Sequence, residues 1–509
     1  MGSGVKNEIS AQTEPASTKD DDDETATPPP EVGEPYTVFS QKEKMVALSI
    51  ATTVNFLAPT SGSMYYPALV PLAHDLNVSQ TKINLTIVTF MIAQALVPQI
   101  TGGISDNQGR RPILLLGLFI YLAVNIGLAL QTSFAALLVL RCFQSFGSAG
   151  AAVVAGSITA DLVTRAERGR YVAITSLGRT VGPALGPLLG GVLTKCLGWR
   201  STFWFLAIFS AVLFLVILLF LRETCRSVVG NGSLPCHPMN RPVVEMIRGG
   251  QPEYRKKKKK EEEEEEEEEK KTTTAFRSGL KIILDRELGL LILWTAVFLS
   301  GSMAILSTMP ALLDEKYQLN PLQVGLCYLP YAVGGLVSRF AFGKLTDWNF
   351  QRHAQKAGVE LQRNRQSNRQ MQRIPLEKAR LQLALPLGYF SGLCLLGYGW
   401  VMDRNVHLAG PLVVLFFLGG ASVGAVNMAS TLLLDLHASQ PGMVLGALAM
   451  YSCFLGAGVV AAALPLMQAV GIGWLGTIIA GIWALASSLL WVLYVHGHRW
   501  RMERDGILD

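Results

Sequence analysis

Apolar residues fill twelve long stretches of this chain, and polar residues collect in the segments between them. A helix that crosses a bilayer needs about 20 consecutive apolar residues, because each residue advances the helix by only about 1.5 Å. The stretches that reach this length are residues 45–70, 83–104, 112–131, 134–158, 171–194, 201–221, 288–310, 322–344, 382–402, 408–434, 443–470 and 474–495. The pattern predicts an all-α membrane protein with twelve transmembrane helices.

Composition supports a membrane protein. The 509 residues are 50% hydrophobic and only 16% charged, which is outside the usual range of soluble domains. The first 40 residues are polar and acidic, so we expect no cleavable signal and a first span that stays in the membrane. Basic residues such as Arg110 and Arg111 occur in alternate loops, which predicts cytoplasmic termini and a cytoplasmic central loop.

The spans divide into two groups of six around a charged segment. We therefore expect five regions: a disordered acidic cytoplasmic tail (1–43), an N-terminal six-helix half (44–222), a charged cytoplasmic linker (223–281), a C-terminal six-helix half (282–497) and a cytoplasmic tail (498–509). The linker contains Lys256–Lys260 followed by Glu261–Glu269, a run that can bury no apolar area. A solvated spacer is the simple interpretation of this linker, and a docking site for a regulator is the alternative.

The loop between the second and third spans reads Gly102-Gly103-Ile104-Ser105-Asp106-Asn107-Gln108-Gly109-Arg110-Arg111. Its glycines allow a tight turn, and Asp106 lies within reach of a neighbouring helix N-terminus, where a carboxylate is favoured. The loop resembles the signature loop of the major facilitator superfamily of secondary transporters. That resemblance implies two six-helix pseudo-repeats and a cytoplasmic gate. The gate residues would be Gly102, Asp106, Gly109, Arg110 and Arg111, with Asp347 in a shorter second copy.

The fifth span carries glycines at every fourth position, namely Gly178, Gly182, Gly186 and Gly190. They share one helix face and permit backbone-to-backbone packing, while Pro183 and Pro187 bend the helix. Ordinary helix packing would explain the glycines alone. The combination resembles the antiporter motif of the 12-span drug:proton antiporters, and this resemblance implies an exporter.

Arg141 lies inside the fourth span, where an arginine costs about 2.5–3.5 kcal/mol to insert. We therefore expect it to face the interior or water, and snorkelling to the interface is the alternative. Gln144 shares its helix face. The two residues resemble the family's Arg-x-x-Gln-Gly-x-Gly motif, with Ser145 in place of the first glycine, and the resemblance implies that they take part in proton coupling.

Polar and aromatic residues near the Pro59–Gly62 bend suit the wall of a central cavity, because they offer hydrogen bonds and flat apolar surface. We expect spans one, four, five, seven, eight, ten and eleven to line the path. The candidate substrate-cavity residues are Asn55, Tyr65, Tyr66, Arg179, Trp294, Tyr328, Tyr331 and Asn427. The segment from residue 55 to residue 79 resembles the fungal quinidine-resistance and dityrosine-exporter branch, whereas Ala447–Cys453 departs from it.

The charged residues away from the span ends are all arginines: Arg141, Arg179 and Arg339. Unpaired cations in a cavity would favour an anionic or neutral substrate over a cationic drug. The hypothesis is a weak acid or a polar-aromatic metabolite as cargo. The same absence of carboxylates leaves the proton carrier unassigned, so proton antiport is what the family resemblance implies.

The sequence lacks the residues that characterise several other classes of protein. The sequence has no Gly-x-x-x-x-Gly-Lys phosphate loop, no histidine within the spans and no cysteine spacing typical of a metal site. We therefore expect no enzyme activity, no metal and no cofactor beyond a proton gradient. The net charge of +6 is spread among the loops and does not indicate nucleic-acid binding.

The expected protein is a monomeric secondary transporter that exports a small organic compound, such as a drug, organic acid or secondary metabolite, by alternating access. Its partners would be the substrate, protons and the lipid bilayer. The resemblance implies the plasma membrane of a fungal cell, with a vacuolar or vesicle membrane as the alternative. A proton-coupled importer and a transport-dead membrane receptor are the alternative functions.

Overall fold

The fold is a bundle of long helices, seen in a computed structural model that describes residues 37–163, 168–231, 237–244, 282–358, 374–404, 406–437 and 441–504. Within these ranges the regular structure is helical and contains no strand. The acidic tail through residue 36 and the Lys/Glu run lie outside the described residues, so the expectations for them stay predictions.

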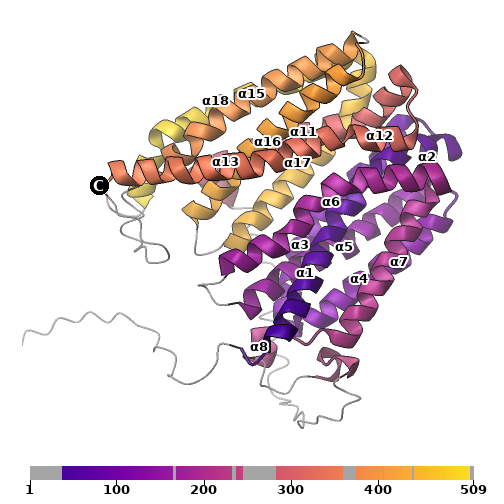
Figure 1. Ribbon diagram of the computed structural model, residues 1–509, viewed down its shortest axis with the longest axis vertical. Coiled ribbons are helices and arrows are strands. Elements are labelled where there is room, and N and C mark those ends of the chain that lie inside the picture. Colours follow the sequence, from indigo (N-terminus) through magenta and orange to yellow (C-terminus); the bar gives the residue numbers. More distant parts are fainter. Residues whose placement is uncertain are drawn as a thin grey trace, which may run out of the picture. The chain divides into compact units, whose positions relative to one another are not determined.

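The N-terminal half holds six long helices and three shorter ones (Figure 1). The long helices are α1 (Gln41–Ser63), α3 (Gln80–Gln108), α4 (Arg110–Leu130), α5 (Phe134–Leu162), α6 (Arg168–Leu197) and α7 (Arg200–Phe220). The turn η1 (Tyr66–Ala68) and helix α2 (Leu69–Asp75) continue α1, and the short α8 (Arg226–Val229) follows α7.

The C-terminal half repeats this arrangement. After the turns η2 (Pro238–Asn240) and η3 (Ile282–Leu284), its helices are α11 (Arg286–Tyr317), α12 (Pro321–Cys327), α13 (Leu329–Lys356), α15 (Leu376–Asp403), α16 (Ala409–Leu436), α17 (Pro441–Val470) and α18 (Ile472–Arg504). Helices α12 and α13 together form one span. Every predicted apolar stretch falls on a helix.

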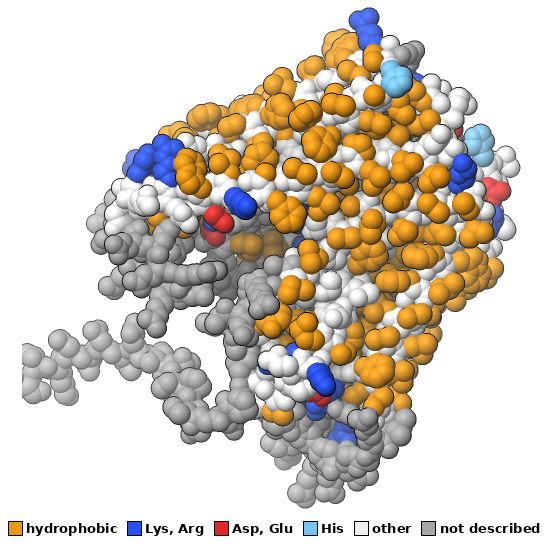
Figure 2. Space-filling view, viewed as in Figure 1, with side chains coloured by type: hydrophobic (Ala, Val, Ile, Leu, Met, Phe, Trp, Pro, Cys, Tyr) orange, Lys and Arg blue, Asp and Glu red, His pale blue; other side chains and the backbone are white. Residues whose placement is uncertain are grey.

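Eleven helical segments in the described ranges are long and apolar enough to cross a membrane. Helix α1, with 23 residues, is longer than α4 and α7 but carries Thr, Asn and Ser residues, and it packs inside the N-terminal half against α5 and α6. Hydrophobic side chains such as Phe119, Ile208 and Leu485 are largely exposed on the outside of the bundle, and Figure 2 shows such side chains spread over one lateral face. A surface of this kind suits lipid.

Three predicted domain boundaries need adjustment. Helix α1 begins at Gln41 because Ser40 and Glu43 form a capping box, so the ordered chain starts earlier than residue 44. The linker does not begin as a solvated segment, since Glu223 and Cys225 are buried against the N-terminal half. Helix α18 runs to Arg504 with Arg501 buried, so the residues from 498 to 504 belong to the bundle.

The glycine face of α6 packs against α1. A Cβ atom on Gly178 would overlap the carbonyl oxygen of Thr52, and one on Gly190 would overlap that of Met64. Gly182 and Gly186 meet α1 between these points. Backbone packs on backbone at Gly178 and Gly190, and the side chains of Thr60 and Ser63 approach the glycines between them, so the four glycines form one packing face as the spacing predicts.

We expect Gly178→Ala to lower the free energy of unfolding by about 1–3 kcal/mol, because the backbone oxygen of Thr52 cannot move aside easily. The melting temperature of the detergent-purified protein measures this loss. Gly156→Ala is the matched control, since a Cβ atom there meets nothing within 4 Å. Equal melting temperatures for the two variants would contradict the close packing of α1 and α6.

Candidate transport cavity and charged ends

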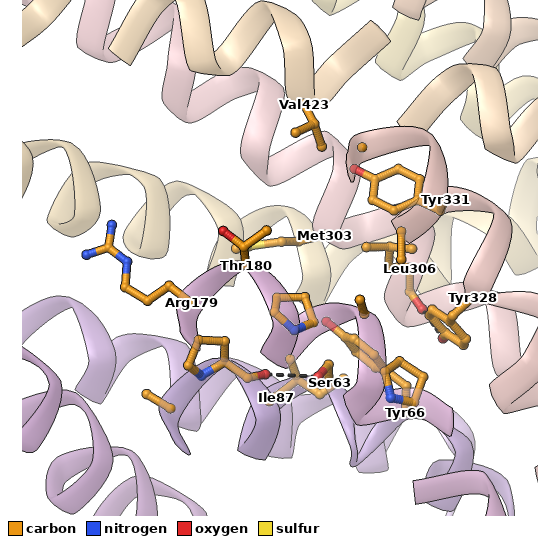
Figure 3. Close-up of a pocket in the computed structure, with 18 of the residues that line it drawn as sticks. Ser63, Tyr66, Ile87, Arg179, Thr180, Met303, Leu306, Tyr328, Tyr331 and Val423 are labelled. Carbon is orange, nitrogen blue, oxygen red and sulfur yellow. Dashed lines mark hydrogen bonds between the residues drawn. The ribbon is translucent and has the colours of Figure 1, made fainter. Parts of the chain in front are cut away.

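A cavity of about 350 Å³ lies between the two halves, with walls formed by α1, α3, α5, α6, α11, α13 and α16. Four of the predicted cavity residues line it: Tyr66, Arg179, Tyr328 and Tyr331. Figure 3 shows the tyrosines at one end and the Arg179 guanidinium pointing away from them. The cavity is mostly apolar between these ends, as is usual for small-molecule sites.

The tyrosine end of the cavity is closed by contacts between the halves. The rings of Tyr66 and Tyr328 stack with centroids 5.6 Å apart and planes 2° apart, and the Tyr328 hydroxyl donates to the Leu306 carbonyl at 2.6 Å. Beside them α6 meets α12 backbone to backbone, because a Cβ atom on Gly191 would lie 3.3 Å from the Cα atom of Gly325. We name this the Tyr66 end, and the opposite end of the bundle the Asp106 end.

Arg141 lies on the cavity wall but is only 1% exposed. Its guanidinium lies over the rings of Tyr65 at 4.0 Å and Phe90 at 4.6 Å, and it donates to Gln144 Oε1 at 2.5 Å. Cation–π contacts and this hydrogen bond stabilise a charge that has no ion-pair partner among the described residues. The snorkelling alternative is therefore wrong.

The hydrogen bonds continue beyond Gln144, which donates to Asn125 Oδ1 at 2.7 Å. Asn125 donates to the Tyr121 carbonyl at 2.7 Å, and the Tyr121 hydroxyl bonds to Ser61 on α1. Gln144 itself is fully buried behind the wall and does not line the cavity. This network fixes the orientation of Arg141.

Four other predicted wall residues do not line the cavity: Asn55, Tyr65, Trp294 and Asn427. Asn55 donates to the Thr175 carbonyl at 3.4 Å, Tyr65 lies under Arg141, and Trp294 donates to Ser487 Oγ at 3.1 Å. Asn55, Tyr65 and Trp294 thus contact polar groups of their own half, because helix rotation turns them away from the opposite half.

The choice of lining helices also needs correction. Helix α3 contributes Phe90, Met91 and Gln94 to the wall, although span two was not among those expected. Helix α17 (span eleven) is absent from the lining and packs along α3 instead. Gln99 on α3 donates to the Gly446 carbonyl at 3.1 Å, and Gly456 lets Met91 approach closely.

At the Asp106 end, the helix N-terminus of α4 is capped by Glu223 and not by Asp106. The buried Glu223 carboxylate accepts from the backbone N–H groups of Arg110 at 2.8 Å and Arg111 at 3.1 Å, and from those of two residues just after it. Gly109 has φ +104°, and a Cβ atom there would lie 2.5 Å from Glu223 Oε2. Glycine is required on both grounds.

Asp106 pairs with Arg110, four residues on, and its side chain is 60% exposed. The stronger partner of Arg110 is Asp161 at the end of α5, at 2.9 Å, with both side chains largely buried. Arg111 is buried and donates to the backbone carbonyls of Leu218, at 2.8 Å, and Met239. The arginines thus tie the loop to α5, to α7 and to the start of the linker.

The start of the linker covers this loop. The Asp106 carbonyl accepts from Ser227 Oγ and from Cys225 Sγ at 3.3 Å. Burial raises the pKa of the Cys225 thiol, which keeps it a neutral donor. Gly102 packs against Val153 on α5. Gly102, Asp106, Gly109, Arg110 and Arg111 therefore lie together in one cluster. Glu223 and Asp161 belong to the same cluster, and the sequence analysis missed both.

The second half has its own version of these pairs, and Asp347 is not part of it. Asp347 is exposed and forms no ion pair within the described residues. Arg380 at the start of α15 donates to Asp435 at the end of α16 at 3.1 Å, which matches the Arg110–Asp161 pair in position. A comparison of the two halves, each with an aspartate ending its fourth span, could have revealed this pair.

On the Tyr66 side of the membrane a smaller cluster ties α2 to α7. Arg200 donates to Asp75 at 2.7 Å and the Trp199 indole donates to the same oxygen at 3.0 Å. These two hydrogen bonds lower the pKa of Asp75, so the carboxylate stays charged. The cluster fixes the position of η1 and of Tyr66 within it.

Two helical halves around a central cavity, with charged clusters at both ends, define a transport protein of the membrane. The chain belongs to the major facilitator superfamily, whose sequence profile matches residues 51–459. It is an integral, multi-pass membrane protein and not an enzyme.

Relatives agree with this assignment. The chain is 38% identical to the MFS-type transporter clz19 of Cochliobolus lunatus, over 98% of this chain and 92% of that protein. It is 29% identical to the multidrug transporter AQR1 of Candida glabrata, over 92% of this chain and 79% of that protein. The crystal structure of the human organic anion transporter MFSD10 has the same fold, with a TM-score of 0.53 at 19% identity, over 88% of this chain and 99% of that chain.

We expect Glu223→Ala to destabilise the protein by about 2 kcal/mol or more, because four backbone donors lose one buried carboxylate. The measurement is the melting temperature in detergent. Glu503→Ala is the control: Glu503 makes an exposed ion pair with Arg499, of a kind worth about 1 kcal/mol at most. A control that melts as low as Glu223→Ala would refute the capping role.

Asp435→Asn is expected to cost about 1–3 kcal/mol, because Arg380 is only 8% exposed and loses its charged partner. Asp347→Asn is expected to stay within about 0.5 kcal/mol. Thermal melting of the two single variants checks the assignment. A lower melting temperature for Asp347→Asn than for Asp435→Asn would show that Asp347, and not Asp435, is the stabilising carboxylate of the second half.

Proposed function

We propose that this chain is a proton-coupled efflux pump that exports a small organic compound by alternating access, in the plasma membrane of a fungal cell. The observation that carries the proposal is the cavity between the halves. Its Tyr66 end is closed by the Tyr66–Tyr328 stack and the α6–α12 contact. Arg179 and Arg339, which line it further toward the Asp106 end, are exposed.

Two features support export. The charged loop and the start of the linker support a cytoplasmic Asp106 end under the positive-inside rule, and in that orientation the cavity would load from the cytoplasm. The prolines of α6, Pro183 and Pro187, line the cavity while its glycines contact α1, which fits the antiporter motif. The multidrug transporter AQR1 is a relative with a matching activity in its name.

Proton coupling in this proposal depends on Arg141 and Gln144. Arg141 presents a permanent charge to the cavity and connects through Gln144 and Asn125 to α4. Movement of a proton or a charged substrate past Arg141 would change the electrostatic free energy of that network. Buried carboxylates that could exchange a proton lie at the Asp106 end, where protonation of Asp161 would release Arg110.

Expression in a pump-deficient yeast tests the function. We expect wild-type protein to lower the internal concentration of an exported compound, and to do so more strongly at acidic external pH, where the inward proton gradient is larger. Arg141→Ala and Asp106→Asn should reduce export, the first by about tenfold or more because Arg141 has no substitute charge at its site. Membrane abundance is measured for each variant.

A panel of organic acids and lipophilic cations identifies the cargo class in the same strain. A rise in internal compound would instead show an importer. Deletion of residues 251–275 should leave export intact, since these residues lie outside both halves. Loss of function on that deletion with no measurable transport in the intact chain would show a receptor.

A further inference from the structure

Arg179 and Arg339 come from different halves and meet at one cavity. Arg179 is on α6 and Arg339 on α13, and both line the wall. Arg339 Nη1 donates to Thr180 Oγ1 at 2.7 Å, and Thr180 directly follows Arg179 in the chain. Both arginine side chains are exposed, and neither forms an ion pair with any residue in the described ranges. Two like charges, one from each half, therefore lie on the wall of the same cavity.

Residues around the two arginines leave this charge uncompensated. Among the described residues, the cavity lining contains no aspartate or glutamate, and the third arginine in it, Arg141, adds a further positive charge. Arg141 is fixed between Tyr65 and Phe90 and bonded to Gln144, whereas Arg179 and Arg339 are exposed and Arg339 is held by a hydrogen bond to the neutral Thr180 hydroxyl. A cavity with low-dielectric walls and charge of one sign attracts the opposite sign.

The opposite end of the same cavity is aromatic. Tyr66, Tyr328 and Tyr331 form it, and the hydroxyl of Tyr328 is already bonded to the Leu306 carbonyl. Met303 and Leu306 add apolar surface between this end and the arginines. A ligand that extends from one end to the other therefore contacts flat apolar side chains at one end and guanidinium groups at the other.

We propose that this cavity binds an amphipathic aromatic monoanion, with its anionic group between Arg179 and Arg339 and its ring toward Tyr66 and Tyr328. This inference rests on the proposed transport of a small organic compound, and it assigns that compound's chemical class. Guanidinium groups bind carboxylates in charge-assisted, often bidentate hydrogen bonds. Because the arginines belong to different halves, a bound anion replaces their mutual repulsion with attraction and favours approach of α6 and α13.

Binding to the purified full-length protein in detergent tests the inference without relying on transport. The probes share one ring system: 2-naphthoate, its neutral methyl ester and 2-naphthylmethylammonium. We expect 2-naphthoate to bind most tightly by isothermal titration and the ammonium compound to bind least. Equal binding of the three probes, or tighter binding of the cation, would overturn the proposal.

Arginine variants locate the anionic group. Arg179→Gln and Arg339→Gln should each weaken 2-naphthoate binding by about tenfold and leave the ester unaffected. Arg339→Lys keeps the charge and should recover most of the loss. Lys195→Gln is the matched control, because Lys195 is an exposed cation on α6 outside the cavity. A control that weakens binding as much as the cavity variants would overturn the site.

The double variant tests whether one anion contacts both arginines. Residues that share a ligand are coupled, so Arg179→Gln with Arg339→Gln should weaken binding by less than the product of the two single factors. A loss equal to the product would indicate that the two arginines act on the ligand independently. It would refute a single anion in contact with both. Export of cations by a protein that does not bind 2-naphthoate would refute this inference alone. Binding of 2-naphthoate without export would refute the proposed function alone.

Discussion

Close backbone packing along α6 is the constraint on which the rest of the structure depends. One face of this helix contacts α1 through four glycines, and Gly191 near its end meets Gly325 of the other half. The remaining face is then free to present Arg179, Thr180 and Pro183 to the cavity. A single helix therefore builds the N-terminal half, closes the Tyr66 end of the cavity and supplies its charge. A Cβ atom on the glycine face of α6 would push this helix away from α1. That displacement would disturb the N-terminal half, the closed Tyr66 end and the position of Arg179 together.

Charge in this protein is organised differently at the ends of the bundle and at its centre. At the Asp106 end, arginines pair with carboxylates in the same relative places in both halves: Arg110 with Asp161, and Arg380 with Asp435. Each half also has a buried glutamate at this end, and the two glutamates have different partners. Glu223 after the sixth span caps α4, whereas Glu377 in the first turn of α15 contacts Arg501 near the end of the twelfth span at 3.3 Å.

At the centre, by contrast, arginines have no carboxylate partner in the described residues. Arg141 is stabilised by aromatic rings and by Gln144, at a fixed orientation. Arg179 and Arg339 are exposed instead. Each ion pair at the Asp106 end lies within one half, so it belongs to a cluster that can move as a unit with that half. The unpaired arginines at the centre keep their electrostatic potential available to a ligand. This division of charge is what connects the fold to the proposed binding of an anion.

Much of the architecture could be predicted from the sequence, because helix length and the fourfold glycine spacing are local properties. The twelve apolar stretches, the packing face of α6 and the inward position of Arg141 were all predicted in this way. The role of the Gly102–Arg111 loop as a gate stays a prediction, although the loop itself was found from the sequence. Its chemistry was not, since Glu223 lies 113 residues beyond Arg110 and reaches it only through the packing of α7 on α4.

The cavity wall depended most on tertiary structure. Tyr65 and Tyr66 are neighbours in the chain, yet only Tyr66 faces the other half, because the turn η1 rotates the two side chains apart. Trp294 and Asn55 have suitable chemistry but the wrong rotation. The sequence by itself determined which segments cross the membrane and which charges lie inside them, because these depend on composition and spacing along one chain. Only the tertiary structure decided which of those charges find partners and which side chains line the cavity, because helix rotation and contacts between distant segments determine both.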